Sequence, residues 1–323
     1  MESRVRTSKA KQTGNRSLFA LMVVLIACAP AVSRAQDLAP RAYIITPLHS
    51  NAITLVYSYY TGGVDFNGAA PITDAVGKYS VPAFNYYHSF SFFGRSANIS
   101  GVLPYGVGTF SGNAIGQHRS IYRSGLLDLG VRLSVNLKGG PAMDMRHFVK
   151  WKQKTLIGAS LRVIAPTGQY NPDLLINWGS NRWSFKPEVG YSRRFEHKWL
   201  LDTYGGVWFF TTNPQYFSQP LPPRPQSLSP IGSFEGHLSY DIKPFLWCSL
   251  DGNFWFGGTA TLGTATNPAT RQTASRIGVT GSFPIHKNQS IKATFSDGAY
   301  VRFGGDYRTV SVAWQYSWLG KPK

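Results

Sequence analysis

The sequence predicts an all-β fold, a transmembrane antiparallel up-and-down β-barrel of the Gram-negative outer-membrane type with about 12 strands. Three observations predict it. Apolar and polar residues alternate along many segments, aromatic residues gather near the ends of those segments, and the connections between them are alternately long and short. Alternate side chains of a strand point to opposite faces. A membrane barrel has an apolar outer face, a polar interior, short turns at one end and long loops at the other.

The segment 126–139 shows the alternation most clearly. Leu127, Leu133 and Leu137 belong to one set of alternate positions, and Arg132 and Asn136 belong to the other. A soluble β-sandwich also alternates, but its polar face is the outer one and its apolar face is shared with a second sheet. Here the apolar face is nearly unbroken, whereas the opposite face mixes small, polar and charged groups. This arrangement favours lipid on one side and a hydrated lumen on the other.

The same alternation recurs along the rest of the chain, with Gly, Pro, Asn and Asp in the gaps. In chain order, the other expected strands begin at Ala52, Asn85, Ala97, Lys154, Arg182, Trp199, Phe234, Phe245, Ser275, Ser290 and Arg308. Aromatic residues cluster at several strand ends, as expected for residues at the two membrane interfaces. The clearest cases are Trp183, Phe185, Trp208, Phe209, Phe210, Trp314, Tyr316 and Trp318.

The connections alternate in length. Long ones are expected at 61–78, 104–118, 166–181, 211–230 and 257–273, and short ones at 94–96, 193–198, 243–244 and 284–289. Only the connection 139–153 departs from the alternation. An even strand number with both ends of the barrel domain on the short-turn side fits this pattern.

The first 35 residues read as a signal peptide. A basic stretch is followed by the apolar run 18–32, and the small residues Ser33 and Ala35 precede the expected cleavage site. The sequence Leu25–Cys28 also matches the pattern before a lipid-modified cysteine, but the apolar run continues past Cys28, so we expect cleavage after Ala35. We therefore expect three regions in the chain: the signal peptide 1–35, a short N-terminal periplasmic segment 36–50 and a single barrel domain 51–323.

The chain is strongly basic. It has 33 Lys and Arg against 15 Asp and Glu, and removing residues 1–35 takes six of the former and one of the latter, which leaves a surplus of 13 positive charges. A basic surplus fits nucleic acid, an anionic membrane surface or a basic channel. Export makes nucleic acid the weakest of these partners. Cys248 has no partner in the mature chain, so no intrachain disulfide is expected.

The polar residues on the inner face are the candidate pore-lining residues. By parity with the apolar face, they are Asp128, Arg132, Asn136, Arg162, Lys186, Glu188, Asp202, Glu235, His237, Asp251, Asn253, Arg276 and Lys292. The basic members would raise the local concentration of an anion such as a carboxylate. Alternatively, the charged groups pair with each other and stiffen the barrel wall. No residues have metal-ligand spacing, and no cofactor is expected.

A catalytic alternative rests on one strand, where Glu235, His237 and Ser239 share a face. A serine and a histidine oriented by a carboxylate are the parts of a nucleophilic hydrolase, and a lipid substrate would suit an outer-membrane barrel. Side chains that face the lumen are difficult for lipid to reach. The sequence therefore favours a protein that is not an enzyme.

Two stretches, 163–192 and 302–318, resemble a known bacterial family, and 103–112 is similar to it as well. This is the family of outer-membrane transporters named for the meta-cleavage pathway of phenol degradation. The resemblance implies a transmembrane barrel with a transport role and no catalytic residues. One departure is the end of the chain, where five residues follow Trp318, whereas outer-membrane proteins commonly end on an aromatic residue that the assembly machinery reads.

Together these observations predict an outer-membrane channel for the passive uptake of small solutes that are aromatic or otherwise hydrophobic or anionic. Its expected partners are outer-membrane lipids, the solute and, during biogenesis, the barrel assembly machinery. The alternative is a structural barrel whose loops bind a partner. The sequence determines neither the solute nor the oligomeric state.

Overall fold

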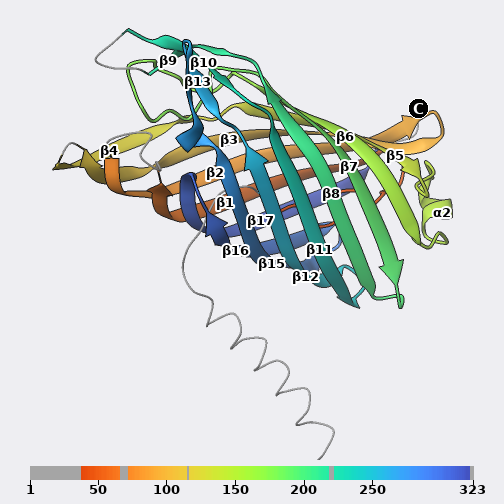
Figure 1. Cartoon of the computed structure of the whole chain (residues 1–323). Helices are drawn as coiled ribbons and strands as arrows, with labels where there is room; N and C mark the ends of the chain where they lie inside the picture. Colours follow the sequence, from red (N-terminus) through yellow and green to blue (C-terminus); the bar gives the residue numbers. More distant parts are fainter. Residues whose placement is uncertain (1–37, 66–71, 115, 218–221, 321–323) are drawn as a thin grey trace, which may run out of the picture. The chain divides into compact units, whose positions relative to one another are not determined.

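The computed structural model describes residues 38–65, 72–114, 116–217 and 222–320, and the predicted signal peptide and Cys28 lie outside this part of the chain. Its main feature is a closed antiparallel barrel with twelve strand positions (Figure 1). The barrel strands are β1 (Ser50–Asp65), β2 (Ile72–Phe92), β3 (Arg95–Ala114), β4 (Gln117–Leu126), β5 (Leu129–Lys138), β6 (Thr155–Ala165), β7 (Ser184–Phe195), β8 (Trp199–Phe210), β11 (Ile231–Lys243), β12 (Leu246–Gly257), β15 (Gln272–His286), β16 (Gln289–Val301) and β17 (Gly304–Leu319).

Barrel strands that are consecutive in the chain pair with each other, except that β4 and β5 both pair with β3, so the thirteen strands occupy twelve positions. β1 pairs with β17 to close the ring. The closing ladder is long: it runs from Ser50 opposite Leu319 to Asp65 opposite Gly304. Closure leaves no strand edge that would expose unpaired backbone groups to lipid. The predicted barrel and its strand number are confirmed.

The strand predicted at 126–139 is present as β5, which begins at Leu129, whereas Leu126 is the last residue of β4. β4 and β5 share one position beside β3. β5 pairs with Ala97–Val102 and β4 pairs with Tyr105–Ala114. The break falls at Asp128, because its carboxylate accepts hydrogen bonds from the backbone N–H groups of Gly168 and Ser180, both at 2.9 Å. A tertiary contact therefore interrupts a strand whose local alternation is continuous.

Two segments that the sequence predicted as long loops are largely strand. β1 and β2 reach Asp65 and Ile72, and β3 and β4 form a hairpin across 104–118. Gly108 shows why this is possible: a Cβ there would lie 2.2 Å from Cβ of Tyr79 on β2. Because glycine has no Cβ, β3 can lie close to Tyr79 of β2 at this position.

The remaining long connections carry the other elements. A four-stranded sheet consists of β9 (Asn213–Tyr216), β10 (Arg224–Leu228), β13 (Ala260–Leu262) and β14 (Ala265–Asn267). It lies at the end of the barrel that carries the long loops, which we call the long-loop end (Figure 1). A short 3₁₀ helix, η1 (Pro268–Thr270), follows β14.

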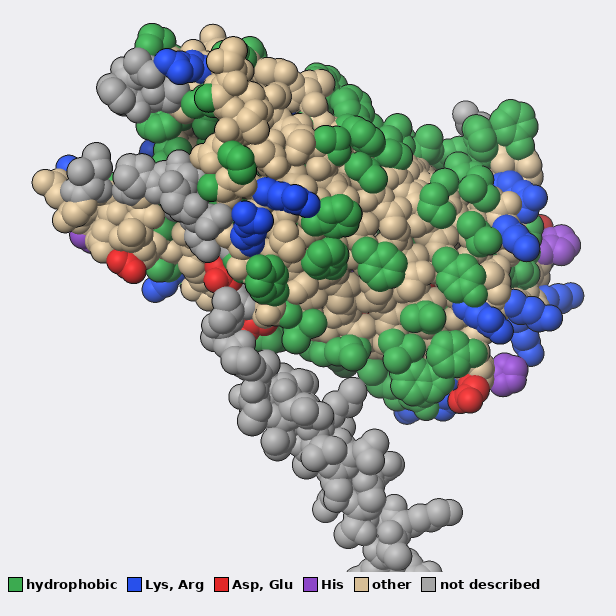
Figure 2. Space-filling model, viewed as in Figure 1, with side chains coloured by type: hydrophobic (Ala, Val, Ile, Leu, Met, Phe, Trp, Pro, Cys, Tyr) green, Lys and Arg blue, Asp and Glu red, His purple; other side chains and the backbone are tan. Residues whose placement is uncertain are grey.

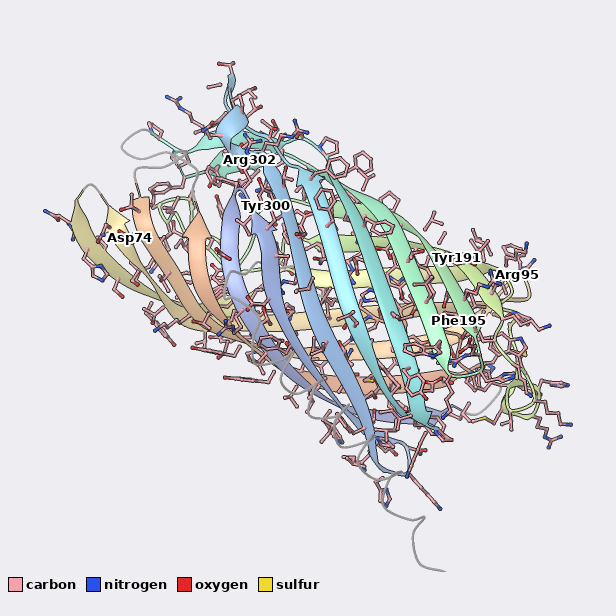
Figure 3. All side chains as sticks on the ribbon, turned by 60° about the horizontal axis from the view of Figure 1, so that its bottom comes forward. Asp74, Arg95, Tyr191, Phe195, Tyr300 and Arg302 are labelled. Atoms are coloured by element: carbon pink, nitrogen blue, oxygen red, sulfur yellow. The ribbon has the colours of Figure 1, made fainter. Side chains whose placement is uncertain are left out.

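The opposite end, which we call the short-turn end, has tight turns at 93–94, 196–198, 244–245 and 287–288. In Figure 3, Asp74, Tyr300 and Arg302 lie toward the long-loop end and Arg95 and Phe195 toward the short-turn end. The connection 139–154 at this end contains α2 (Met145–Phe148), whose N-cap Asp144 accepts a hydrogen bond from the N–H of His147. Among the described residues, no helix has the length and apolar character needed to cross a bilayer.

The outer face of the barrel is apolar. Large hydrophobic side chains cover the visible face between the two ends, and basic side chains gather at the short-turn end (Figure 2). Leu133, Leu250 and Ile277 are among the outward side chains, with 43%, 63% and 50% of their surface exposed. The inward neighbours Ser134 and Asp251 are only 1% and 2% exposed. In these strands, the residues that the sequence predicted to face lipid therefore point outward, and their neighbours in the sequence point into the lumen.

We predict that Leu250→Arg, near the middle of β12, lowers the free energy of unfolding by about 2–4 kcal/mol, because a lipid-facing arginine must be desolvated. Urea titration of the protein in phospholipid vesicles measures this change. Leu250→Ala is the matched control and should cost less than half as much. Equal effects of the two substitutions would contradict a lipid-facing position for Leu250.

Candidate functional site in the barrel lumen

The lumen is occupied by the chain that precedes β1. Residues 38–49, which we call the strap, run inside the barrel, where Tyr43 and Ile45 are 0% and 2% exposed. The ring of Tyr43 lies against Gly158 on β6 and Gly190 on β7, where added Cβ atoms would fall 2.3 and 2.2 Å from it. The two glycines thus form the seat of Tyr43. The strap is the described part of the segment that the sequence predicted as a short N-terminal periplasmic segment, 36–50.

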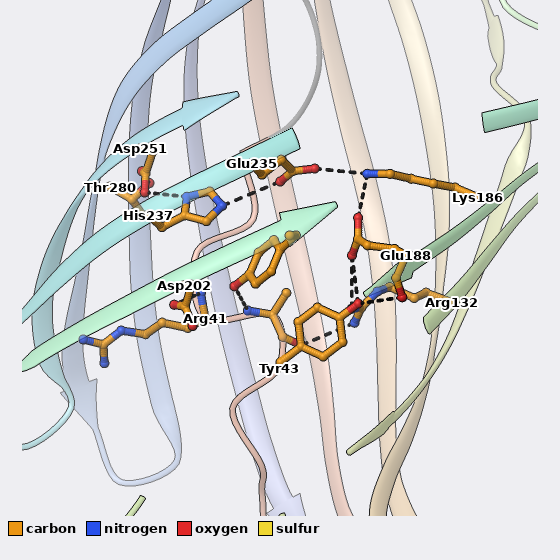
Figure 4. Close-up of polar contacts among 12 residues, drawn as sticks. Arg41, Tyr43, Arg132, Lys186, Glu188, Asp202, Glu235, His237, Asp251 and Thr280 are labelled. Carbon is orange, nitrogen blue, oxygen red and sulfur yellow. Dashed lines mark hydrogen bonds and ion pairs between the residues drawn. The ribbon is translucent and has the colours of Figure 1, made fainter. Parts of the chain in front are cut away.

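Polar contacts fix the strap to the barrel wall (Figure 4). The backbone N–H of Arg41 donates to Asp202 Oδ2 at 3.2 Å, and its guanidinium contacts Asp241 Oδ1 at 2.7 Å. The hydroxyl of Tyr43 donates to Glu188 Oε1 at 3.0 Å. These contacts combine hydrogen bonds with opposite charges, so they define one position for the strap rather than simply covering apolar surface.

A buried group of charged residues surrounds this seat. Lys186 Nζ lies 2.6 Å from Glu188 Oε2 and 3.1 Å from Glu235 Oε1, and Arg132 Nη2 lies 3.7 Å from Glu188 Oε1. The side chains of Lys186, Glu188 and Glu235 are less than 10% exposed. Buried charges of this kind require partners, and each ammonium or carboxylate here has one.

His237 extends the charged group along β11. Its Nδ1 lies 2.9 Å from Asp251 Oδ1, and its Nε2 lies 3.6 Å from Glu235 Oε2. The hydroxyl of Thr280 donates to the other oxygen of Asp251 at 2.7 Å. His237 is therefore held between two carboxylates and, at 1% exposure, is shielded from bulk water.

The structure brings together seven of the thirteen candidate pore-lining residues, and we call them the lumen network. They are Arg132, Lys186, Glu188, Asp202, Glu235, His237 and Asp251. Arg162 lies opposite both Arg132 and Lys186 in the ladder, which makes a row of three cations across β5, β6 and β7. Two members of the row, Arg132 and Lys186, contact Glu188, and Lys186 also contacts Glu235. Whether the network lines a conducting pore stays a prediction.

Other candidates lie apart from the network. Arg276 is 2% exposed and donates to Ser296, Thr309 and the carbonyl of Tyr307. Asn136 and Asn253 are buried on the lumen side at 1% and 6% exposure. Lys292 is exposed near the short-turn end, and Asp128 anchors the β6–β7 loop.

An aromatic cluster lies nearer the long-loop end, and the sequence did not predict it. It consists of Tyr60, Tyr79, Phe110, Trp178 and Tyr307. Tyr79 is central: its ring centroid lies 4.7 Å from Tyr60, 5.0 Å from Tyr307 and 5.6 Å from both Phe110 and Trp178. These separations are those of stacked and edge-to-face aromatic pairs.

Trp178 enters this cluster from the β6–β7 loop rather than from a strand. Its indole lies against Gly106 on β3, where an added Cβ would fall 2.5 Å from the ring. Gly106 belongs to the glycine-rich segment 104–118, which the sequence predicted as a long loop. The role of Gly106 is to accept a ring that arrives from a distant part of the chain, and a local pattern carries no signal of such a contact.

The geometry required by the hydrolase alternative is not formed. The Oγ atom of Ser239 is buried and makes no hydrogen bond within the described residues, while both ring nitrogens of His237 face carboxylates. No group of three or more His, Cys, Asp or Glu side chains in that same part of the chain could hold a metal ion.

Comparisons with known proteins agree with the barrel. The family model described as "Putative MetA-pathway of phenol degradation" matches residues 62–312. No curated protein matches the chain. The COG4313 outer membrane channel from Pseudomonas putida F1 is 16% identical, with a TM-score of 0.71 over 87% of this chain and 100% of that one. The transport unit of the autotransporter AIDA-I from Escherichia coli is 10% identical, with a TM-score of 0.51 over 97% and 100%. At these identities the likeness concerns the fold.

We predict that Tyr43→Ala releases the strap, because the substitution removes both the ring seated on Gly158 and Gly190 and the hydrogen bond to Glu188. Single-channel recording in planar bilayers should then show a conductance several times that of the unmodified protein. Tyr57→Ala, which removes a tyrosine from the outer face, is the control and should leave conductance unchanged. A Tyr43→Ala channel with unaltered conductance would show that the strap does not limit passage.

A second prediction concerns the lumen network. Lys186→Met leaves Glu188 and Glu235 buried without the cation between them, so the free energy of unfolding should fall by about 3 kcal/mol. Chemical denaturation in vesicles measures the loss, and Lys138→Met, at an exposed position on β5, provides the comparison. A loss no greater than that of the comparison variant would mean that Lys186 is not electrostatically coupled to the two carboxylates.

Proposed function

Because this chain belongs to the family described as the MetA-pathway of phenol degradation, we propose that it is an outer-membrane channel for the passive uptake of small solutes with an aromatic or other apolar part, including anionic ones. In this proposal the long-loop end faces the exterior and the short-turn end faces the periplasm, as in other outer-membrane barrels. The barrel assembly machinery would insert it.

The aromatic cluster is the observation that carries the proposal. A solute that enters from the long-loop end meets the rings of Tyr60, Tyr79 and Trp178 before it reaches the polar lumen network. Aromatic faces and edges bind other rings through stacked and edge-to-face contacts. Five packed aromatic rings in the lumen favour a channel for solutes with an aromatic or apolar part over a channel for purely hydrophilic solutes.

The anionic part of the proposal is supported by the surplus of positive charge on the mature chain, which would concentrate anions near the channel. The lumen network adds no net positive charge, because its four carboxylates balance the cations Arg132, Arg162, Lys186 and His237. The strap limits the open cross-section, which suits small solutes.

The main alternative is a structural barrel whose loops bind a partner. Planar-bilayer recording separates the two: discrete openings support the channel, and a correctly inserted but silent barrel supports the structural role. The apolar character of the solute requires a more specific test.

We predict that toluene or benzyl alcohol reduces the conductance of the unmodified channel and that Trp178→Ala raises the concentration needed about five- to tenfold, the effect of losing one aromatic contact. Trp183→Ala is the matched control, since Trp183 follows the same loop but is 45% exposed and lies outside the cluster. Equal responses of the two variants would contradict a solute path through the aromatic cluster.

A further inference from the structure

A cavity lies at the long-loop end, beside the β6–β7 loop that carries Trp178 into the aromatic cluster. It encloses about 130 Å³ between the β6–β7 loop and β9, and the side chains that matter here are Tyr170, Leu174, Leu175, Arg182, Asn213 and Tyr216. Asn177 and Gly179, the chain neighbours of Trp178, form part of the same wall. One side of this loop therefore contributes to the aromatic cluster while the other encloses the cavity.

Among the described residues, Arg182 is the only charged one that lines this cavity. Its Nη2 donates to Gln226 Oε1 at 3.1 Å, whereas its Nη1 is buried and has no hydrogen-bond partner among the described residues. Burial lowers the pKa of Arg182, which reflects the cost of holding this cation away from water. The nearby carboxylate of Asp128 accepts instead from Gly168 and Ser180. A buried guanidinium with an unused donor is a position where an anion is expected.

The polar wall around Arg182 is already ordered. Asn213 is 1% exposed, and its Nδ2 donates to the hydroxyl of Tyr170 at 3.0 Å and to the carbonyl of Ser180 at 3.2 Å. Tyr170 in turn donates its hydroxyl proton to the carbonyl of Gln215 at 2.7 Å. Because these groups bond to one another, the cavity keeps its form without a ligand, and binding requires little reorganisation.

Two apolar side chains, Leu174 and Leu175, line the cavity beside these polar groups, together with Tyr216. The unused Nη1 donor of a single guanidinium suits a carboxylate, whereas a phosphate dianion is usually held by several cations or backbone donors. One guanidinium next to two leucines therefore fits a small ligand with one carboxylate and a hydrophobic body.

We propose that this cavity is an outer recognition site for small organic acids, in which Arg182 binds the carboxylate and Leu174 and Leu175 cover the ring or alkyl chain. The site rests on the proposed function, since it lies on the external route to the lumen, and it gives that function a substrate class. Because Asn177 and Gly179 line the cavity and Trp178 lies in the aromatic cluster, a solute that leaves this site would reach the cluster next.

Calorimetric titration of the full, detergent-solubilised protein with sodium benzoate tests the site. We expect benzoate to bind at least tenfold more tightly than benzyl alcohol, the neutral compound of similar shape, and more tightly than inorganic phosphate. Arg182→Gln should weaken benzoate binding at least tenfold, since a charge-assisted pair is lost. Arg119→Gln, which alters an exposed arginine on β4 at the same end, should bind benzoate as the unmodified protein does.

A second variant guards against a folding defect in Arg182→Gln. Leu174→Glu leaves Arg182 in place but sets a carboxylate in the cavity wall, so it should also abolish benzoate binding while the barrel keeps its heat-dependent shift on gels. Unchanged benzoate affinity in either variant, equal affinity for phosphate, or no benzoate binding by the unmodified protein would overturn the proposal.

Binding in detergent does not require transport, so the two proposals fail separately. Loss of the benzoate site would leave the conductance test with Trp178→Ala untouched. A barrel that binds benzoate through Arg182 but conducts nothing would overturn the channel and leave the site in place.

Discussion

The constraint on which the structure depends is that hydrocarbon offers no hydrogen-bond partner to a backbone group. The pairing of β1 with β17 satisfies it, because this ladder removes the two edges that an open sheet would expose. Once the ring is closed, every strand has a lipid side and a lumen side, and the alternation of residues must follow that division. Leu250 and Asp251, adjacent in sequence, are 63% and 2% exposed for this reason.

Closure also creates an interior, which side chains, chain segments or water occupy. The strap occupies part of it, with Tyr43 seated on Gly158 and Gly190, and the lumen network balances its charges within a few ångströms. The polar half of the interior therefore resembles a fixed wall more than an open pore. The aromatic cluster near the long-loop end has a different chemistry. In the proposed channel, a solute that enters from the long-loop end would meet an aromatic region first and a charged one second.

The sequence predicted the barrel, its strand number and its lipid-facing parity, because a period of two residues is a local property that each strand carries by itself. It placed Glu235, His237 and Asp251 on one face for the same reason. It did not predict the contacts that hold the strap, the break at Asp128 or the entry of Trp178 into the aromatic cluster. Each of these depends on contacts between residues far apart in the chain, and no pattern within one segment records them. Glycines such as Gly158 and Gly190 mark such contacts only once the partner is known.

The most direct test of the account is a cross-link across the closing seam. In a chain that begins at residue 36 and carries Cys248→Ser, the pair Tyr57→Cys and Val312→Cys places thiols on partner residues of β1 and β17. Facing residues of an antiparallel ladder lie at a separation that a disulfide spans. We predict that oxidation forms this disulfide as readily as in the control pair Tyr57→Cys and Pro82→Cys on β1 and β2. A disulfide in the control pair alone would show that the sheet is open.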